Sequence, residues 1–438
     1  MENSYKSLLR LALPIIVSQV GIILVMFADN IMIGRYSTAS LASVSFVNNL
    51  FNTANMCVMG FTYGVTPLIG VLFARKQHSQ AGETVRNALL LNILFSLAVM
   101  AVMGTVFLNL DRFNLPPHLL PIIRPYYLIT LAGLIPIAVF NVFAQWSYAI
   151  NNSSMPMWIL LGANALNVLG NYLLIYGNFG FPELGLTGAG ISTITARLLC
   201  MALIAAYFFR KKEAAAYADG YRGGKASGKM MKRILKTSFP VALQLGLESG
   251  AFSFGAVVTG ILGEIPLASY QVIVIVGTLG FCIYYSIGSA ISVLVSNAKG
   301  KEDSGMMRSI AWKGYHIMLF FAAMASMIFV FAGKHLIMLI SPDPAVIALT
   351  LTLIFPLVLY QLGDATQITF ANALRGTGNV MPMIWIAFVC YFVVGAPATW
   401  IMAITAGAGI YGVILSFSVS LFLAGGLFLW FFLKNTES

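Results

Sequence analysis

The run LLRLALPIIVSQVGIILVMFADNIMIG occupies residues 8–34 and holds one carboxylate, Asp29, in an apolar stretch with no other acid. About 20 apolar residues in a helix span the hydrocarbon core of a bilayer, so this run predicts a transmembrane helix. A carboxylate at membrane depth costs roughly 2.5–3.5 kcal/mol on insertion scales. We therefore interpret Asp29 as a functional residue. The structural alternative is that it caps a neighbouring helix or pairs with a buried base.

Apolar runs of this kind recur along all 438 residues. The chain is 59% hydrophobic and only 9% charged, with a mean hydropathy of +0.88, whereas soluble chains carry about 25% charged residues. The composition predicts an all-α polytopic membrane protein, because long unbroken runs suit helices and not the alternation of a β-barrel. The cysteines lack disulfide or metal-ligand spacing, so we expect them to be packing residues: Cys57, Cys200, Cys282 and Cys390.

Twelve transmembrane helices are predicted, and the basic residues between them indicate their orientation. One side of the membrane receives only Arg35, Arg112, Arg124 and Lys334, while most of the other Lys and Arg residues fall on the opposite side. By the positive-inside rule, both termini are cytoplasmic. The net charge of +11 is therefore explained by the topology of the chain in the membrane, and binding to nucleic acid is not needed to explain it. The expected helices cover residues 8–34, 43–73, 88–110, 120–150, 157–177, 187–209, 234–263, 267–297, 309–332, 344–373, 382–404 and 410–433.

An internal repeat divides these helices into two sets of six. SLLRLALP at 7–14 matches RILKTSFP at 233–240, a spacing of 240 − 14 = 226, and MPM at 155–157 recurs in the same register at 381–383. We expect an N-lobe at 1–209, a flexible cytoplasmic linker rich in Gly, Ser and Lys at 210–233, and a C-lobe at 234–438. Parallel six-helix repeats are related by a pseudo-two-fold axis along the membrane normal, as in many transporters. A duplicated scaffold without a cavity is the alternative.

Three acids lie within predicted helices, namely Asp29, Glu248 and Asp364. The only basic residues at comparable depth are Arg197 on the sixth helix and Arg124 near the outer end of the fourth. Acids without basic partners in a cavity wall would attract cations, exclude anions, and could exchange a proton, a metal cation or a cationic drug. The alternative is that each acid is protonated and merely hydrogen-bonded.

Polar side chains accompany these acids at helical spacing. Gln244 precedes Glu248, and Tyr360 precedes Asp364, by four residues, so each pair shares a helix face. Amides also stripe one face of the fifth predicted helix, at Asn164, Asn167 and Asn171. Such amides either join neighbouring helices or, if they lie near Asp29, form an oxygen-rich pocket for a hard cation.

The residues resemble a known family over nearly the whole chain: the multidrug and toxic compound extrusion (MATE) transporters, in particular their NorM-like branch. The resemblance rests on LALPIIVSQ and FADNIMIG in the first helix, LNVLGNYLLIYGNFGFPELGLTGAGIST across the fifth and sixth, FPVALQLGLES in the seventh and YQLGDATQITFANALRGTGN in the tenth. It implies two six-helix lobes around a V-shaped cavity and efflux of organic cations driven by inward Na⁺ or H⁺. It also implies a monomer in the bacterial inner membrane.

The resemblance also implies roles for individual residues. Asp29 matches the acid of the first helix, and Pro14 matches a proline implicated in bending that helix. Na⁺ could bind at Asp29, Asn167 and Asn171 or at Glu248 and Asp364. Substrate or ion contacts are implied for Asp29, Asn167, Asn171, Thr193, Glu248, Gln271, Phe281, Tyr360 and Asp364. Two features depart from the family: the first loop, GRYSTASLAS, is rich in hydroxyls, and Asn171 stands where some members have aspartate.

Other functional classes have less support in the sequence. The runner-up is a lipid-linked precursor flippase of the same superfamily, but such proteins place basic residues in the cavity to hold a diphosphate. A channel would not need two matched halves that carry acids. The chain has no HExxH motif, nucleophile elbow or metal-ligand cluster, so we expect no catalytic residues, no cofactor and no enzymatic activity.

Overall fold

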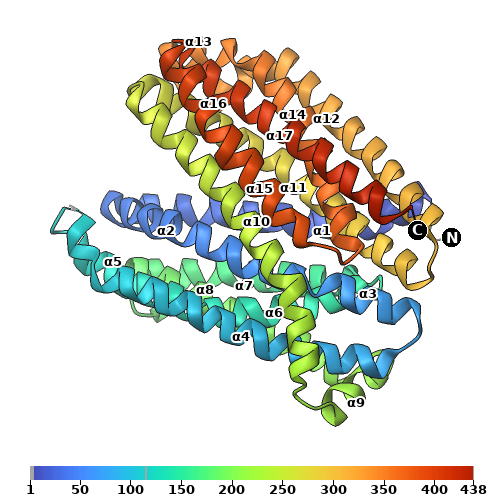
Figure 1. Cartoon of the computed structure of the whole chain (residues 1–438). Coiled ribbons are helices and arrows are strands. Elements are labelled where there is room, and N and C mark those ends of the chain that lie inside the picture. The colour runs from blue at the N-terminus through green and yellow to red at the C-terminus, as the bar shows by residue number, and fades with distance from the viewer. Residues whose placement is uncertain (1–3, 114–115, 438) are drawn as a thin grey trace. The chain divides into compact units, whose positions relative to one another are not determined.

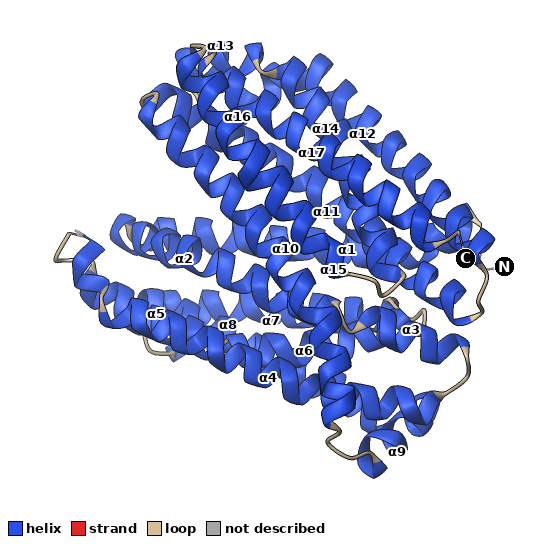
Figure 2. Cartoon of the chain, in the orientation of Figure 1, coloured by secondary structure: helices blue, strands red, loops and turns tan. Residues whose placement is uncertain are grey.

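The computed structural model describes residues 4–113 and 116–437, and every regular element in these ranges is helical (Figure 1 and Figure 2). Within them, 11 helical segments are long and apolar enough to cross a membrane. A twelfth span results if α13 (Pro344–Thr352) and α14 (Ile354–Gly376), which are bent by 55°, form one span. The predicted all-α membrane fold is confirmed, with 11 spans or, if α13 and α14 form one span, the expected twelve.

Several membrane spans consist of two or more helices that follow one another in the chain. The α-helices are α1 Tyr5–Tyr36, α2 Thr38–Tyr63, α3 Thr66–Ala74, α4 His78–Leu108, α5 Leu120–Ala132, α6 Leu134–Ala149, α7 Ser154–Tyr176, α8 Gly185–Arg210, α9 Ala215–Gly223, α10 Gly228–Ile261, α11 Glu264–Gly300, α12 Ser304–Ile340, α13 Pro344–Thr352, α14 Ile354–Gly376, α15 Met381–Ala387, α16 Ala396–Trp400 and α17 Gly409–Asn435. Short 3₁₀ helices are η1 Leu110–Phe113, η2 Asn178–Gly180 and η3 Lys212–Ala214, and π-helices are η4 Phe388–Gly395 and η5 Ile401–Thr405.

Two helices of the C-unit begin at an aspartate that caps them. Asp303 precedes α12 and accepts a hydrogen bond from the backbone N–H of Met306 at 2.7 Å. Asp343 precedes α13 and accepts from the N–H of Ala345 at 2.8 Å, while Pro344 occupies the first helical position. Both arrangements satisfy N–H groups that the first turn of a helix leaves without a partner, and proline at the first position lacks such a group.

The helices form two compact units, and two helices contribute to both. The N-unit is Val17–Ala242, and the C-unit is Met1–Ile16 with Leu243–Ser438. The chain therefore changes unit inside α1 after Ile16 and inside α10 after Ala242, positions separated by 242 − 16 = 226, the spacing of the sequence repeat. Pro14 and Pro240 each stand two residues before the change. Proline removes an intrahelical hydrogen bond, so both helices are weakened at equivalent places.

Each unit is held together by its own apolar core. In the N-unit, Phe51 and Tyr127 are buried with ring centroids 4.8 Å apart, and they pack with helices α2, α4 and α5. In the C-unit, Phe417 of α17 packs against Phe252 of α10, with centroids 5.1 Å apart, and against Leu357 of α14. These contacts bring helices distant in the chain together within each unit.

The segment expected to be a flexible linker contains an ordered helix. Within residues 210–233, α9 packs against α4 so closely that a Cβ at Gly82 would lie 1.9 Å from the Tyr217 carbonyl oxygen, and one at Gly220 would lie 2.0 Å from that of Ser79. Arg86 of α4 donates hydrogen bonds to carbonyls at the end of α9 and just beyond, at 3.2 Å and 2.6 Å. Burial raises the pKa of Tyr217 to about 12. Gly220, one of the glycines of the segment expected to be flexible, instead permits close packing against α4.

We expect Gly220→Ala to lower the free energy of unfolding by about 1–3 kcal/mol, because the new Cβ would overlap the backbone of α4. Gly223→Ala is the matched control, since nothing lies within 4 Å of a Cβ there. That variant should be neutral or slightly stabilising, because alanine favours a helix over glycine by about 1 kcal/mol. Thermal unfolding of the purified protein measures both. Equal melting temperatures for the two variants would contradict docking of α9.

Candidate functional site

Asp29 of α1 lies against α7 in the N-unit. Asn171 Nδ2 donates a hydrogen bond of 2.5 Å to Asp29 Oδ1. With the Asn167 amide oriented so that its nitrogen faces the acid, this side chain donates to the same oxygen at 3.2 Å. Its own oxygen then accepts from the hydroxyl and the backbone N–H of Thr193, both at 3.2 Å. These four residues, the N-unit site, join an acid, two amides and a hydroxyl.

Small residues place α7 and α8 close enough for this network. A Cβ at Gly170 of α7 would lie 2.4 Å from the Ser192 hydroxyl, and one at Gly188 of α8 would lie 2.4 Å from the Leu174 carbonyl oxygen. The Ser192 hydroxyl also donates to the Asn167 carbonyl at 2.8 Å. Glycine at such positions lets helix backbones approach in a membrane, which brings Thr193 to Asn167.

The third asparagine of the predicted stripe is not part of this network. The buried Nδ2 of Asn164 has no hydrogen-bond partner among the residues described, and neither has Asn171 Oδ1, beside Asp29. One residue from another helix lies nearby: Tyr126 of α5 is within electrostatic range of Asp29, and also of Arg197. Helical spacing could not have identified Tyr126 as a neighbour, because it belongs to a different span.

Glu248 of α10 lies in a second polar cluster, in the C-unit, which we call the C-unit site. Gln244 Nε2 donates to Glu248 Oε2 at 2.8 Å, as the shared helix face predicts, and Gln367 of α14 also hydrogen-bonds this carboxylate. Asp364 and Tyr360, both on α14, lie within electrostatic range of Glu248. The two carboxylates are deeply buried, with 8% of Glu248 and 3% of Asp364 exposed. The structure thus brings together acids that are 116 residues apart in the chain.

Two further tyrosines adjoin this cluster and were not identified from the sequence. Tyr284 of α11 donates to Gln361 Oε1 at 2.7 Å and is within electrostatic range of Asp364. Tyr391 lies in the π-helical turn η4, within electrostatic range of Glu248 and Asp364. π-Helical turns often mark functional sites, but the apolar sequence around Tyr391 contains no signal that predicts one.

Three other residues implied by the resemblance have no described interaction with the acids of these clusters. Gln271 of α11 is exposed, and Phe281, also on α11, stacks on Tyr285 with centroids 5.9 Å apart. No described hydrogen bond links Gln271 to Glu248 or Asp364. Pro14 belongs to the C-unit, although it shares α1 with Asp29 of the N-unit.

The electrostatic character of both sites suits cations. In residues 4–113 and 116–437, Asp29, Glu248 and Asp364 form no ion pair, and the hydrogen-bond donors to Asp29 and Glu248 are neutral amides. No group of three or more His, Cys, Asp and Glu side chains that could hold a metal ion occurs there. Each site therefore offers one or two carboxylates with neutral oxygens, which can accept a proton, a monovalent cation or a cationic ligand.

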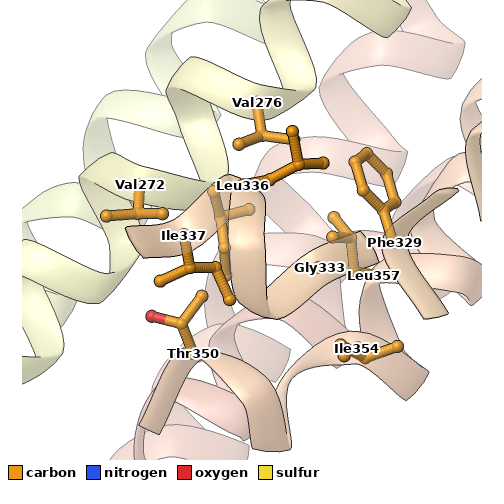
Figure 3. A pocket seen from close by; sticks show the side chains of 10 residues that line it. Val272, Val276, Phe329, Gly333, Leu336, Ile337, Thr350, Ile354 and Leu357 are labelled. Carbon is orange, nitrogen blue, oxygen red and sulfur yellow. The ribbon is translucent and has the colours of Figure 1, made fainter. Parts of the chain in front are cut away.

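A separate apolar cavity in the C-unit is unsuitable for a polar substrate. Figure 3 shows aliphatic side chains and Phe329 around it, with Thr350 as the one hydroxyl. Its volume of about 20 Å³ has room for about one water molecule. It lies beside the bend between α13 and α14, and its lining residues are Val272, Ile273, Val276, Phe329, Gly333, Leu336, Ile337, Thr350, Ile354 and Leu357.

The family model described as MatE matches residues 14–173 and 240–401, so its two matched segments begin 226 residues apart, at Pro14 and Pro240. Together they cover more than half of the chain. The chain belongs to the MatE family. The resemblance inferred from the sequence is thereby confirmed, and this MatE-family chain is a multi-pass membrane protein with 11 or 12 spans in the described residues.

Individual relatives match over almost their full length. A protein of Photorhabdus laumondii called "Probable multidrug resistance protein NorM" is 28% identical over 91% of this chain and 88% of its own. A Bacillus subtilis protein of the same name is 27% identical over 100% of this chain and 96% of its own. A solved structure of a MOP superfamily transporter from Pyrococcus furiosus has a TM-score of 0.90 and 16% identity, covering 99% of this chain and 96% of that one. At that identity, the structural likeness supports the fold alone.

Proposed function

We propose that this MatE-family chain is a multidrug efflux transporter that exports organic cations in exchange for an inward-moving Na⁺ or H⁺, by alternating access. The observation that carries the proposal is the set of three membrane-embedded carboxylates without basic partners, each within one of two polar sites. A buried, uncompensated carboxylate is costly, and binding a cation removes that cost. The multidrug resistance named for the NorM relatives agrees with this proposal.

Coupling follows if the ion and the drug compete for these acids in one conformation. A ligand can shift a conformational equilibrium only by as much as its affinities for the two states differ. A cation bound at Glu248 and Asp364 neutralises the charge that attracts an organic cation, so the drug leaves more readily. At the other membrane face the cation leaves these acids and another drug molecule binds. On this proposal the transporter needs small-molecule substrates and a lipid bilayer, with no cofactor.

We further propose a monomer in the bacterial inner membrane, with both termini and α9 in the cytoplasm. The placement rests on the excess of Lys and Arg on one side of the spans. It predicts that a cysteine introduced near the C-terminus, at Lys434, reacts with a membrane-impermeant reagent only after the cells are opened, whereas one introduced at His118 reacts in intact cells.

Efflux from proteoliposomes with separately imposed gradients tests the coupling. Ethidium export should accelerate when a Na⁺ gradient alone or a pH gradient alone is directed opposite to export, and this comparison identifies the ion. The coupling free energy between two ligands is typically about 1–3 kcal/mol, so binding of one ligand changes the affinity for the other about 5–150-fold. Export that responds to neither gradient would contradict cation coupling. Binding of a lipid-linked diphosphate without ethidium transport would favour a flippase instead.

A further inference from the structure

Four exposed basic side chains share one face of the first turns of α10, and we call them the α10 basic face. They follow the helical spacing i, i+3, i+4 and i+7: Lys229, Lys232, Arg233 and Lys236. The opposite face is buried and repeats that spacing with Ile234, Thr237, Ser238 and Val241. Burial explains why charges are absent from one face, but not why the exposed face holds four bases and no acid.

Contacts within the N-unit hold this part of α10 in place. A Cβ at Gly64, at the end of α2, would lie 2.3 Å from the Ser238 Cα, so the buried face of α10 packs closely there. Asn87 of α4 accepts from the Ser227 N–H at 3.0 Å and donates to the Lys225 carbonyl at 3.2 Å, just before the helix begins. The α10 basic face is therefore presented by a docked helix.

The charges of this face are not balanced by nearby acids in the chain. No acid occurs between Asp219 and Glu248, and the first turn of α10 contains none. Within residues 4–113 and 116–437, none of the four side chains forms an ion pair. Lys229 lies in the first turn of α10, where the helix dipole favours anions and disfavours cations. An anionic ligand would relieve both this cost and the mutual repulsion of the bases.

Exposed apolar side chains continue from the α10 basic face toward the membrane span. Leu235 is 46% exposed and Phe239, three residues after Lys236, is 47% exposed. Basic side chains near the end of a membrane helix extend their charged heads to the interface while their stems cover apolar surface. A soluble anion would contact the bases alone, whereas a phospholipid offers a phosphate to the bases and acyl chains to the apolar residues.

We propose that the α10 basic face binds the phosphate of an anionic phospholipid whose acyl chains pack along Leu235 and Phe239. The proposed topology places this lipid in the cytoplasmic leaflet. Clusters of four or more Lys and Arg residues directly beside a membrane helix attract anionic lipids in this way. The site is specific to the second repeat, since the positions 226 residues before Lys232, Arg233 and Lys236 are Lys6, Ser7 and Arg10.

Native mass spectrometry of the purified full-length protein in detergent, titrated with phosphatidylglycerol or phosphatidylcholine of the same acyl chains, tests the site. The wild type should bind phosphatidylglycerol more tightly. The double variant Lys232→Gln/Lys236→Gln should weaken this binding about 25-fold, from about fivefold for each basic residue at an anionic membrane surface. Its melting temperature should match the wild type, because substitutions of exposed side chains rarely change stability.

Lys211→Gln/Lys212→Gln is the matched control, because it removes two exposed charges from the same connection between membrane spans but leaves the α10 basic face intact. It should bind phosphatidylglycerol like the wild type. Equal loss in the two double variants would show a general effect of charge and overturn the site.

Two other results would also overturn the proposal. Equal affinity of the wild type for the two lipids would exclude recognition of an anionic headgroup. Displacement of phosphatidylglycerol by an equal concentration of inorganic phosphate would reassign the bases to a soluble anion. A preference for phosphatidylglycerol that only the α10 variant loses supports the site. None of these measurements involves transport, so their failure leaves the proposed efflux function standing.

Discussion

Replacing Asp364 with Asn is expected to abolish the effect of the coupling cation on drug binding while the protein stays folded. Asp364 is 3% exposed, and its carboxylate lies within electrostatic range of Glu248 and Tyr360. Asparagine has the same shape and one remaining acceptor oxygen, so mainly the charge is lost. Since the wild-type carboxylate forms no described ion pair, losing it should not lower stability and could raise it.

The measurement is the dissociation constant of ethidium at several concentrations of the coupling ion. In the wild type we expect the ion to weaken ethidium binding about 5–150-fold, the usual range of coupling between two ligands. In Asp364→Asn and in Glu248→Gln the constant should be almost independent of the ion, and export should fall accordingly. Asp219→Asn on α9 is the control, because it removes the same charge from an exposed side chain. Full ion dependence in both site variants would refute a coupling role for these acids.

Asp29→Asn is the second substitution for which we expect a large effect, a loss of ion-driven export of about 5–150-fold. Its Oδ1 accepts from Asn171 and, with the amide of Asn167 turned toward it, from that residue as well. An asparagine at position 29 keeps an oxygen for these donors, so the change removes the negative charge and preserves most of the network. Export from proteoliposomes under an imposed ion gradient measures the loss.

Two asparagines on α7 provide variants that separate charge from hydrogen bonding. Asn171→Leu keeps the charge of Asp29 but removes a donor to it, so we expect a smaller loss of export, of about tenfold. Asn164→Leu should export like the wild type, because the buried Nδ2 of Asn164 has no described partner. Replacing an unsatisfied buried amide with an apolar group is neutral or stabilising. If Asn164→Leu and Asn171→Leu were equally impaired, the network around Asp29 would not explain the result.

The two sites are carried by different units and differ in composition. The N-unit site has one acid and two amides, whereas the C-unit site has two acids, two glutamines and tyrosines. The position 226 residues after Asp29 is Gly255, so the repeat did not copy this acid. Gly255 lies where a Cβ would be 2.3 Å from the Phe417 ring, so the equivalent place in the C-unit is filled by an aromatic side chain.

Much of the architecture is determined by local sequence. Spans are visible because about 20 apolar residues are needed to cross the bilayer, and the placement of Lys and Arg predicts their orientation. The three intramembrane acids stand out because each is costly at that depth. Even the Gln244–Glu248 hydrogen bond could be expected, since residues four apart share a helix face. Each of these features can be predicted from a single segment of the sequence, without knowing which other segments it contacts.

Contacts between segments were decided only by the tertiary structure. Helical spacing placed Asn164, Asn167 and Asn171 on one face, but the packing of α7 on α8 and α1 determines that two of them reach Asp29. Gly220 lies in the segment that was expected to be a flexible linker from its Gly, Ser and Lys content, yet it is where α9 meets α4. Tyr391 reaches the acids through a π-helical turn. Periodicity specifies which side chains share a face, whereas the partner of that face depends on close packing between helices far apart in the chain.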